Sequence, residues 1–158
     1  MRYAFGEWIY KKAKKDKQIV LLVGDIGFGV FDKFRKEFPE RFLNLGIAEQ
    51  SLVGIAAGLA LEGFKPYVYT ITPFLIERAF EQIKIDVDSM NLNVTLVGYA
   101  DYPEQGITHS ELNAHIMDIL PKIINYYPTS SKQTLIYLED AYKHTGPKFF
   151  SLKKDGKP

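Results

Sequence analysis

Residues 42–71, FLNLGIAEQSLVGIAAGLALEGFKPYVYTI, hold one complete strand–helix–strand unit. We predict a short strand over Phe42–Leu45 and another over Tyr67–Ile71. Between them, Ala48–Glu62 is rich in Ala and Leu, and Gly63 follows it as a residue that commonly caps a helix C-terminus. Two strands joined by a helix form the crossover unit of a parallel sheet.

The same alternation of strand and helix continues on both sides of this unit. Six strands alternating with helices predict a three-layer α/β/α fold with a mostly parallel sheet. We expect one domain over residues 1–152 and a polar tail over 153–158, with ligands at the carboxyl ends of the strands. The other predicted strands are Ile19–Val23, Asn93–Tyr99, Ile123–Tyr127 and Lys148–Leu152, and the other predicted helices are 4–16, 30–37, 75–90, a weaker 109–120, and 131–143.

Composition excludes several classes of protein. The formal net charge of the 158 residues is +1, so the strongly basic surface of a nucleic-acid-binding protein is absent. With no cysteine, the chain has no disulfide, no thiolate nucleophile and no cysteine-ligated zinc. The three histidines form no metal-binding spacing, and no apolar run is long enough for a membrane span. We therefore expect no metal site of its own, no membrane contact and a cytoplasmic location.

A glycine-rich loop, Gly24–Gly29, directly follows the first strand. Its glycines allow a tight turn and close approach of a ligand to the backbone. The spacing is GxxGxG, whereas a dinucleotide loop is GxGxxG, and Asn44 or Leu45 stands where that motif has an acidic residue. A plain structural turn therefore remains an equal alternative to a binding loop.

Glu49 lies in the first turn of the predicted helix that starts at Ala48. A first-turn glutamate is normally a capping residue or a partner of the helix dipole. Its neighbours, Ile47 and Leu52 among them, are apolar, and burial among them would favour a protonated carboxyl. The helix N-terminus has the opposite effect, so both interpretations remain open.

Gly54 and Gly58 lie on one side of the same helix. Glycine inside a helix costs up to about 1 kcal/mol relative to alanine. Two of them on a shared side indicate that another backbone comes close. That backbone belongs either to the chain's own sheet or to another subunit.

His109 stands where the loop after the fourth strand meets the next helix. A histidine at this edge of the sheet could donate a hydrogen bond to a substrate oxygen, although a cap or surface residue is the ordinary interpretation. His115 and His144 have the pattern of surface or packing residues.

Five stretches resemble, in their order, the pyrimidine-binding domain of thiamine diphosphate enzymes. The nearest branch comprises transketolase and 1-deoxyxylulose-5-phosphate synthase, and the likeness spans about residues 2–150. Together the motifs are specific, although any one alone would not be. The stretches are 38–50 (FPERFLNLGIAEQ), 56–60 (AAGLA), 63–66 (GFKP), 78–83 (RAFEQI) and 106–109 (GITH).

The resemblance implies a catalytic role for Glu49. In this family a carboxyl directed at N1' of thiamine diphosphate supports the imino tautomer, whose nitrogen removes the proton from C2. Ile47 would line the thiazolium pocket, and Asp25 would lie near the same ring. Phe74 would stack on the aminopyrimidine, or Leu75 would take that place, because the spacing to Arg78 is one residue longer than in the synthase.

The resemblance also implies a substrate side to the site. His109 would contact a sugar substrate, and Arg2 stands where transketolases carry an arginine for the substrate phosphate. Gln105 replaces the acidic residue of the family's EDGPTH loop, which puts the substrate or its stereochemistry in question. The acidic pair that usually follows the histidine is replaced by Asn113 and Ala114.

The chain lacks the GDG…NN motif with which this family holds Mg²⁺ and the diphosphate. The resemblance therefore implies a partner chain that carries this diphosphate-binding domain and its Mg²⁺. Thiamine diphosphate would be shared between the two chains, in a heterotetramer of a split enzyme. The implied reaction is transfer of a two-carbon ketol unit between sugars or sugar phosphates. The alternatives are a split 2-keto acid decarboxylase, a deoxyxylulose-phosphate-synthase-like enzyme, and a non-catalytic binding or regulatory module.

Overall fold

The centre of the computed structural model, which describes residues 1–100, 102–111 and 113–154, is a six-stranded sheet. Its strand order is β2-β1-β3-β4-β6-β5, and all five neighbouring pairs are parallel. The predicted mostly parallel sheet is confirmed. The strands are β1 (Ile19–Val23), β2 (Phe42–Asn44), β3 (Lys65–Ile71), β4 (Thr95–Tyr99), β5 (Ile124–Tyr126) and β6 (Lys148–Leu152).

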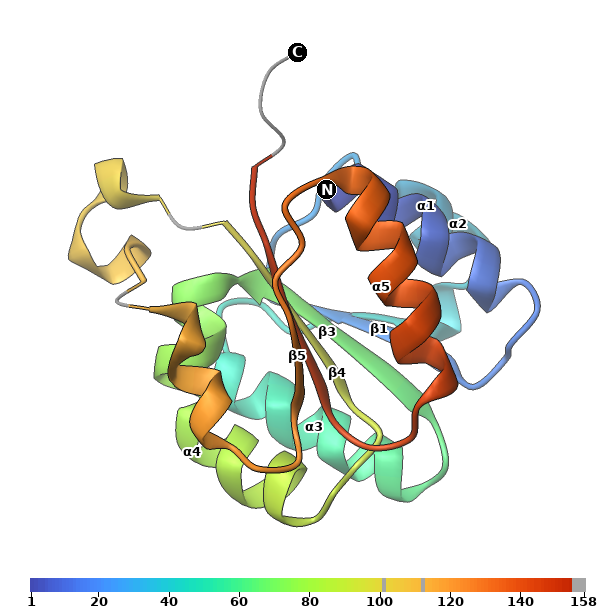
Figure 1. Ribbon diagram of the computed structural model, residues 1–158. Helices are drawn as coiled ribbons and strands as arrows, with labels where there is room; N and C mark the ends of the chain where they lie inside the picture. The colour runs from blue at the N-terminus through green and yellow to red at the C-terminus, as the bar shows by residue number, and fades with distance from the viewer. Residues whose placement is uncertain (101, 112, 155–158) are drawn as a thin grey trace.

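Helices cover both faces of the sheet, as Figure 1 shows. Helices α1, α2 and α5 lie on one face, and α3 and α4 lie on the other. The predicted three-layer α/β/α arrangement is therefore confirmed. The α-helices are α1 (Arg2–Ala13), α2 (Asp32–Glu37), α3 (Glu49–Leu61), α4 (Phe80–Gln82) and α5 (Ser131–Lys143).

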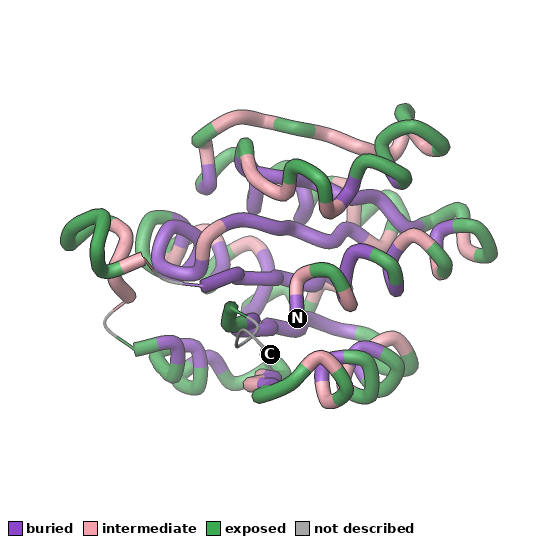
Figure 2. The backbone as a smooth tube through the Cα atoms, turned by 90° about the horizontal axis from the view of Figure 1, so that it is seen from above, coloured by how far each residue is buried: buried purple, intermediate pink, exposed green. Residues whose placement is uncertain are grey.

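The sheet separates two hydrophobic cores. Along β3, Tyr67 and Tyr69 belong to the core beneath α1 and α5, whereas Val68 belongs to the core beneath α3. The strands β1, β4 and β6 are buried along their whole length, which Figure 2 shows as purple tube between two greener layers. Burial on both faces explains why these strands are mostly apolar, although β6 also buries Lys148 and Ser151.

The predicted helix over residues 75–90 is not a regular α-helix. It consists of a π-helical turn, η2 (Phe74–Arg78), then α4, then a second π-helical segment, η3 (Ile83–Ser89). A π-turn closes its hydrogen bonds over one more residue than an α-turn. Such a turn would accommodate the one extra residue that the resemblance implies before Arg78.

The loop after β4 also differs from the expected pattern. Instead of one helix over 109–120, it holds the 3-10 turns η4 (Pro103–Gln105), η5 (Ile107–His109) and η6 (Ala114–Ile119). The side chain of Asn113 accepts a hydrogen bond from the backbone of His115, so the last of these turns starts later than predicted. In Figure 1 the part with η4 and η5 projects away from the sheet, whereas η6 lies beside α4 and contributes Ala114 and Met117 to the core. One further 3-10 turn, η1 (Pro39–Arg41), precedes β2.

The glycines of α3 do not contact the sheet. Gly54 and Gly58 are exposed, and a Cβ built at either position would meet no atom within 4 Å. Of the two alternatives for these glycines, close approach to the chain's own sheet is therefore wrong. An interface with another subunit remains a prediction for this side of α3.

Within the described part of the chain, no helix is both long enough and apolar enough to cross a membrane. The domain boundary expected at residue 152 coincides with the end of β6. Lys153 and Lys154 are the described residues of the predicted tail, and 155–158 lie outside the described residues.

Candidate active site

Glu49 is the first residue of α3 and is only 3% exposed. Its Oε2 accepts a hydrogen bond from Arg78 Nη1 at 3.2 Å, and its Oε1 accepts one from Thr70 Oγ1 at 3.4 Å. Behind Thr70, a Cβ at Gly24 would lie 2.8 Å from the threonine Oγ1, so only glycine fits there without displacing it. The carboxylate is thus held between the carboxyl end of β3 and the turn η2.

An open cleft lies over Glu49. Its volume is about 500 Å³, within the size range of small-molecule sites. The predicted thiazolium contact, Ile47, lies on its rim and is 70% exposed. We call it the Glu49 cleft, and its lining residues are Ile47, Ala48, Glu49, Gln50, Ser51 and Arg78.

Phe74 and His109 form a contiguous group with Arg78. The guanidinium carbon of Arg78 lies 3.5 Å from the centre of the Phe74 ring. The His109 ring meets Phe74 at a centroid distance of 4.8 Å and an angle of 66°. Leu75, the other residue considered for the stacking position, is fully buried in the core beneath α3. Of the two, Phe74 is the one next to the partner of Glu49, and its role in stacking remains a prediction.

Asp25 is held in a strained backbone conformation at the end of β1, with a φ of 53°. Asn44 Oδ1 accepts hydrogen bonds from the backbone N–H of Asp25 at 3.1 Å and of Gly46 at 3.0 Å. Asn44 Nδ2 donates to Asp25 Oδ1 at 3.2 Å. A single amide therefore ties the loop after β1 to the turn that leads into Glu49.

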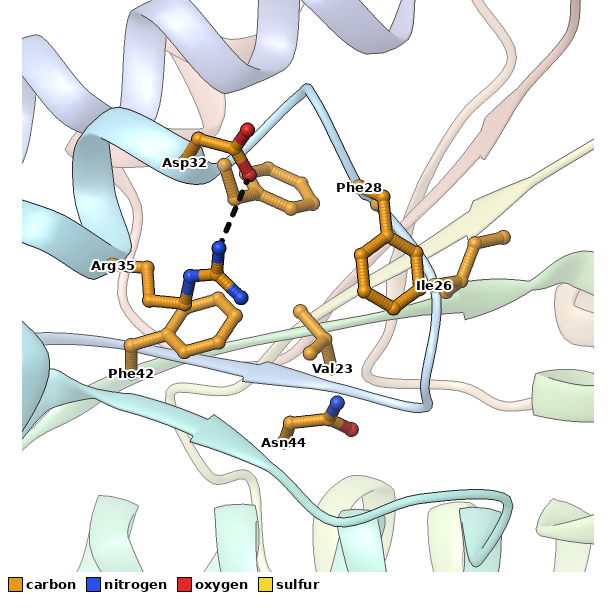
Figure 3. Close-up of a pocket in the computed structure, with 9 residues that line it drawn as sticks. Val23, Ile26, Phe28, Asp32, Arg35, Phe42 and Asn44 are labelled. Atoms are coloured by element: carbon orange, nitrogen blue, oxygen red, sulfur yellow. Dashed lines mark ion pairs between the residues drawn. The ribbon is translucent and has the colours of Figure 1, made fainter.

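The glycine-rich loop borders a second, much smaller cavity, shown in Figure 3. Ile26 and Phe28 lie on one side of it, and Asp32 and Arg35, which form an ion pair at 3.8 Å, lie on the other. Its volume of about 20 Å³ is room for about one water molecule. It cannot contain a ring system, whereas the Glu49 cleft is large enough to do so.

The remaining predicted residues lie away from the lining of this cleft. Arg2 is the first residue of α1, with its guanidinium carbon 5.0 Å from the Tyr3 ring and 5.3 Å from the Tyr99 ring. Gln105 is exposed at the end of η4. His109 is half-buried and touches the site through Phe74. The structure therefore brings Glu49, Ile47, Phe74 and His109 together. Asp25 is connected to the turn before Glu49 only through Asn44, and Arg2 and Gln105 lie outside this group.

The donor set fits the aminopyrimidine end of thiamine diphosphate. A buried carboxylate faces an open cleft, with an aromatic ring beside it. Among the residues that the structure describes, no three His, Asp or Glu side chains are grouped so that they could hold a metal ion.

Comparison with known proteins then identifies the family. The family model for the transketolase pyrimidine binding domain matches residues 1–156. This chain belongs to that family. The resemblance that the sequence motifs indicated is thus confirmed over the whole length of the domain.

Two curated relatives of this pyrimidine-binding domain lie in different branches. Over 128 residues it is 42% identical to one subunit of the apulose-4-phosphate transketolase from Actinobacillus succinogenes, a match that covers 78% of this chain and 40% of the relative. Over 153 residues it is 35% identical to 1-deoxy-D-xylulose-5-phosphate synthase from Acinetobacter baumannii, covering 90% and 23% respectively. The chain thus spans less than half the length of these relatives.

Solved structures agree on the fold of the pyrimidine-binding domain. A structure described as a split-gene transketolase in an inactive beta4 tetramer matches with a TM-score of 0.88 at 33% identity, covering 99% of this chain and 52% of the other. Transketolase from Campylobacter jejuni matches with a TM-score of 0.84 at 19% identity, covering 96% and 25%. At that identity the second match concerns the fold alone.

Sequence reasoning missed three contributors to the site: Thr70, Arg78 and Asn44. Thr70 and Thr72 are polar residues at the end of the apolar strand β3 and directly after it. This pattern in the sequence could have indicated a polar site there. Arg78 is visible there only as part of the RAFEQI motif. Asn44 is visible in the sequence as part of the stretch 38–50 and as a non-acidic residue where a dinucleotide loop has an acid, but neither observation indicates its contact with Asp25.

Proposed function

We propose that this domain is the pyrimidine-binding subunit of a split, thiamine diphosphate-dependent transketolase-like enzyme. The observation that carries the proposal is the buried carboxylate of Glu49 at the head of α3, facing a cleft of about 500 Å³. When bound, the cofactor would supply a C2 carbon that attacks a ketose carbonyl. Glu49 would hold a proton at its N1' atom.

Other residues of the chain would orient the cofactor. Phe74 would offer a ring face to the aminopyrimidine, and Ile47 would line the thiazolium side from the cleft rim. Asp25, held by Asn44, would lie beside the same end of the cleft. The Mg²⁺ and the diphosphate would be bound by the partner subunit.

The substrate we propose is a sugar or sugar phosphate. His109 would contact it, because its ring lies against Phe74 in the loop after β4. Arg2 would bind its phosphate, and Gln105 would read a hydroxyl at the position where the family has an acid. One relative is named for a phosphorylated sugar, apulose 4-phosphate, which supports this substrate class.

The partner we propose is a diphosphate-binding subunit in a heterotetramer, in the cytoplasm. The exposed side of α3, with its two glycines, is the surface we assign to that contact. One relative is named as a subunit and one structure is described as a split-gene enzyme, and both support a two-chain enzyme. The 35% identity to a deoxyxylulose-phosphate synthase keeps a synthase-like reaction as the second candidate.

The test is Glu49→Gln in the complex of this chain with its diphosphate-binding partner. Glutamine is nearly isosteric but cannot serve as the acid at N1', so we expect turnover and cofactor C2–H/D exchange to fall by about 10²–10⁴-fold. Glu40→Gln, at an exposed glutamate in the turn η1, is the matched control and should leave both rates unchanged. Wild-type exchange in the Glu49 variant would show that the residue is only structural.

A further inference from the structure

The side chain of Arg78 contacts both the Glu49 carboxylate and the Phe74 ring, the two groups that the aminopyrimidine ring of the cofactor would contact. Its guanidinium pairs with Glu49 Oε2 at 3.2 Å and lies 3.5 Å from the centre of the Phe74 ring. A planar guanidinium over an aromatic face is a favourable cation–π arrangement, and its N–H groups suit a carboxylate. Arg78 thus imitates a flat, hydrogen-bonding ring placed between an acid and an aromatic face.

The burial of the three residues follows from this arrangement. Glu49 is 3% exposed and Phe74 is 8% exposed, whereas the Arg78 side chain is 39% exposed. Arg78 lines the Glu49 cleft and Phe74 does not. The guanidinium therefore separates the phenyl face and one carboxylate oxygen from the open space of the cleft.

We propose that Arg78 is a positioning residue that fills the aminopyrimidine subsite of the free chain and leaves it when the ring binds. This proposal rests on the proposed function, since it takes the cofactor ring as the ligand. In the free chain Arg78 holds the Glu49 carboxylate in place. On binding, the ring takes over the Phe74 face and the Oε2 oxygen, while Thr70 continues to hold Oε1.

The position of Arg78 allows this movement. It is the last residue of the π-turn η2, on the rim of the cleft, with open space on its outer side. Glu49 and Phe74 are instead packed into the body of the domain. Because the ring must displace existing contacts, the affinity measured for it is lower than the affinity of the uncovered site.

The experiment uses this chain in isolation and the free aminopyrimidine half of the cofactor, 4-amino-5-hydroxymethyl-2-methylpyrimidine. The compound is titrated to millimolar concentration and its binding is followed by NMR. Arg78→Met removes the guanidinium that covers the subsite and should tighten binding of the probe by about tenfold. This is roughly the strength of the cation–π contact and ion pair that the probe no longer has to displace. Arg35→Met is the matched control, because Arg35 forms only an exposed ion pair with Asp32, and it should bind as the wild type does.

The same titration gives a second readout in the wild-type chain. The side-chain resonances of Arg78 should start with the ring-current shift of a group stacked on Phe74 and lose that shift as the probe binds. Arg78→Lys keeps the charge but stacks less well, so its affinity should lie between those of the wild type and Arg78→Met. This variant also provides a test if the methionine variant does not fold.

Three results would overturn the proposal. The first is that Arg78→Met and Arg78→Lys bind the probe no more tightly than the wild type does. The second is an Arg78 resonance that keeps its stacked shift when the probe is at saturation. The third is that no variant binds the probe, because a subsite without the arginine should bind the ring. A failure here with an inactive Glu49→Gln complex would leave the proposed function standing. An active Glu49→Gln complex would instead refute the function itself.

Discussion

Asn44 connects the ends of β1 and β2 through three hydrogen bonds of one amide group. Two of them involve Asp25, which has a positive φ, a conformation that costs a non-glycine residue free energy. Compensation by neighbouring contacts is needed for such a conformation to persist. Asn44 supplies that compensation next to the turn that leads into Glu49.

We expect Asn44→Leu to lower the free energy of unfolding by about 1–3 kcal/mol, because three hydrogen bonds of roughly 1 kcal/mol each are lost. Asn44→Asp keeps both acceptor bonds but places a carboxylate oxygen against the Asp25 carboxylate, so at neutral pH it should also be destabilising. Urea unfolding measures the free energies, and backbone NMR should locate the changes at Asp25 and Gly46. Equal stability of the leucine variant and the wild type would refute this role.

Lys148 begins β6 and is 2% exposed, with its Nζ donating to Asn93 Oδ1. Burial, with a smaller effect from Lys65, lowers the pKa of Lys148 from 10.5 to about 8. The unfolded chain therefore binds this proton more tightly than the folded chain does. Consequently the free energy of unfolding increases as pH rises through the interval between the two pKa values.

For Lys148 this contribution should amount to about 2 kcal/mol between pH 7 and pH 9.5. Lys148→Met has no proton to lose, so its stability should show a correspondingly smaller rise over the same range. It should also be more stable than the wild type at pH 7. Urea unfolding at several pH values measures the slope, and identical slopes for the two proteins would contradict the assignment.

At the scale of the element, α3 combines a buried face with an open one. On its inner face, the α3 residues Leu52, Val53 and Ala56 are fully buried, whereas Gly54 and Gly58 on its outer side face open space. The exposed apolar residues Ile47 and Leu61 lie near the two ends of the same helix. The packing of α3 within the domain therefore involves its buried face only, and its glycine side makes no contact within the described part of the chain.

Gly54→Ala and Gly58→Ala should each therefore stabilise the isolated chain by about 0.5–1 kcal/mol, because alanine is the better helix former and its methyl group meets nothing. In the assembled enzyme the same methyl groups would separate closely packed backbones and weaken the complex. Thermal unfolding measures the first effect, and sedimentation with the partner measures the second. Unchanged assembly of the double variant would rule out this side of α3 as the interface.

At the scale of the whole molecule, the candidate site is built from one end of the sheet. The acid comes from the start of α3, its hydroxyl partner from β3 and its guanidinium partner from η2. The described residues contain no group of ligands for a metal ion. Glu49 and its partner Arg78 thus border an open cleft at this end of the sheet.

The isolated chain should accordingly bind thiamine diphosphate weakly and show no transketolase activity. Most of the cofactor's charge lies in the diphosphate, for which we place the binding groups on the partner. Calorimetry of the purified chain with thiamine diphosphate and Mg²⁺ measures the affinity. Tight binding, in the absence of any second protein, would contradict the division of the site between two chains.

The sequence by itself determined the class of the fold, and it predicted Glu49 as the acid of the candidate site. Continuous apolar strands alternating with helices leave few arrangements other than a covered parallel sheet, because each strand must be buried on both faces. Glu49 could be located because a carboxyl at the start of an apolar helix is visible in the local pattern. Thr70 could have been found in the same way, because it is a polar residue near the end of an apolar strand.

Only the tertiary structure decided which side chains meet Glu49. Arg78 is 29 residues away in sequence, and Asn44 reaches Asp25 across 19 residues. These pairs form because parallel strands bring their carboxyl ends to one edge of the sheet, and strand order decides which loops become neighbours. The π-turn that places Phe74 beside Arg78 depends on packing against α3 and β3, which no local preference of the sequence encodes.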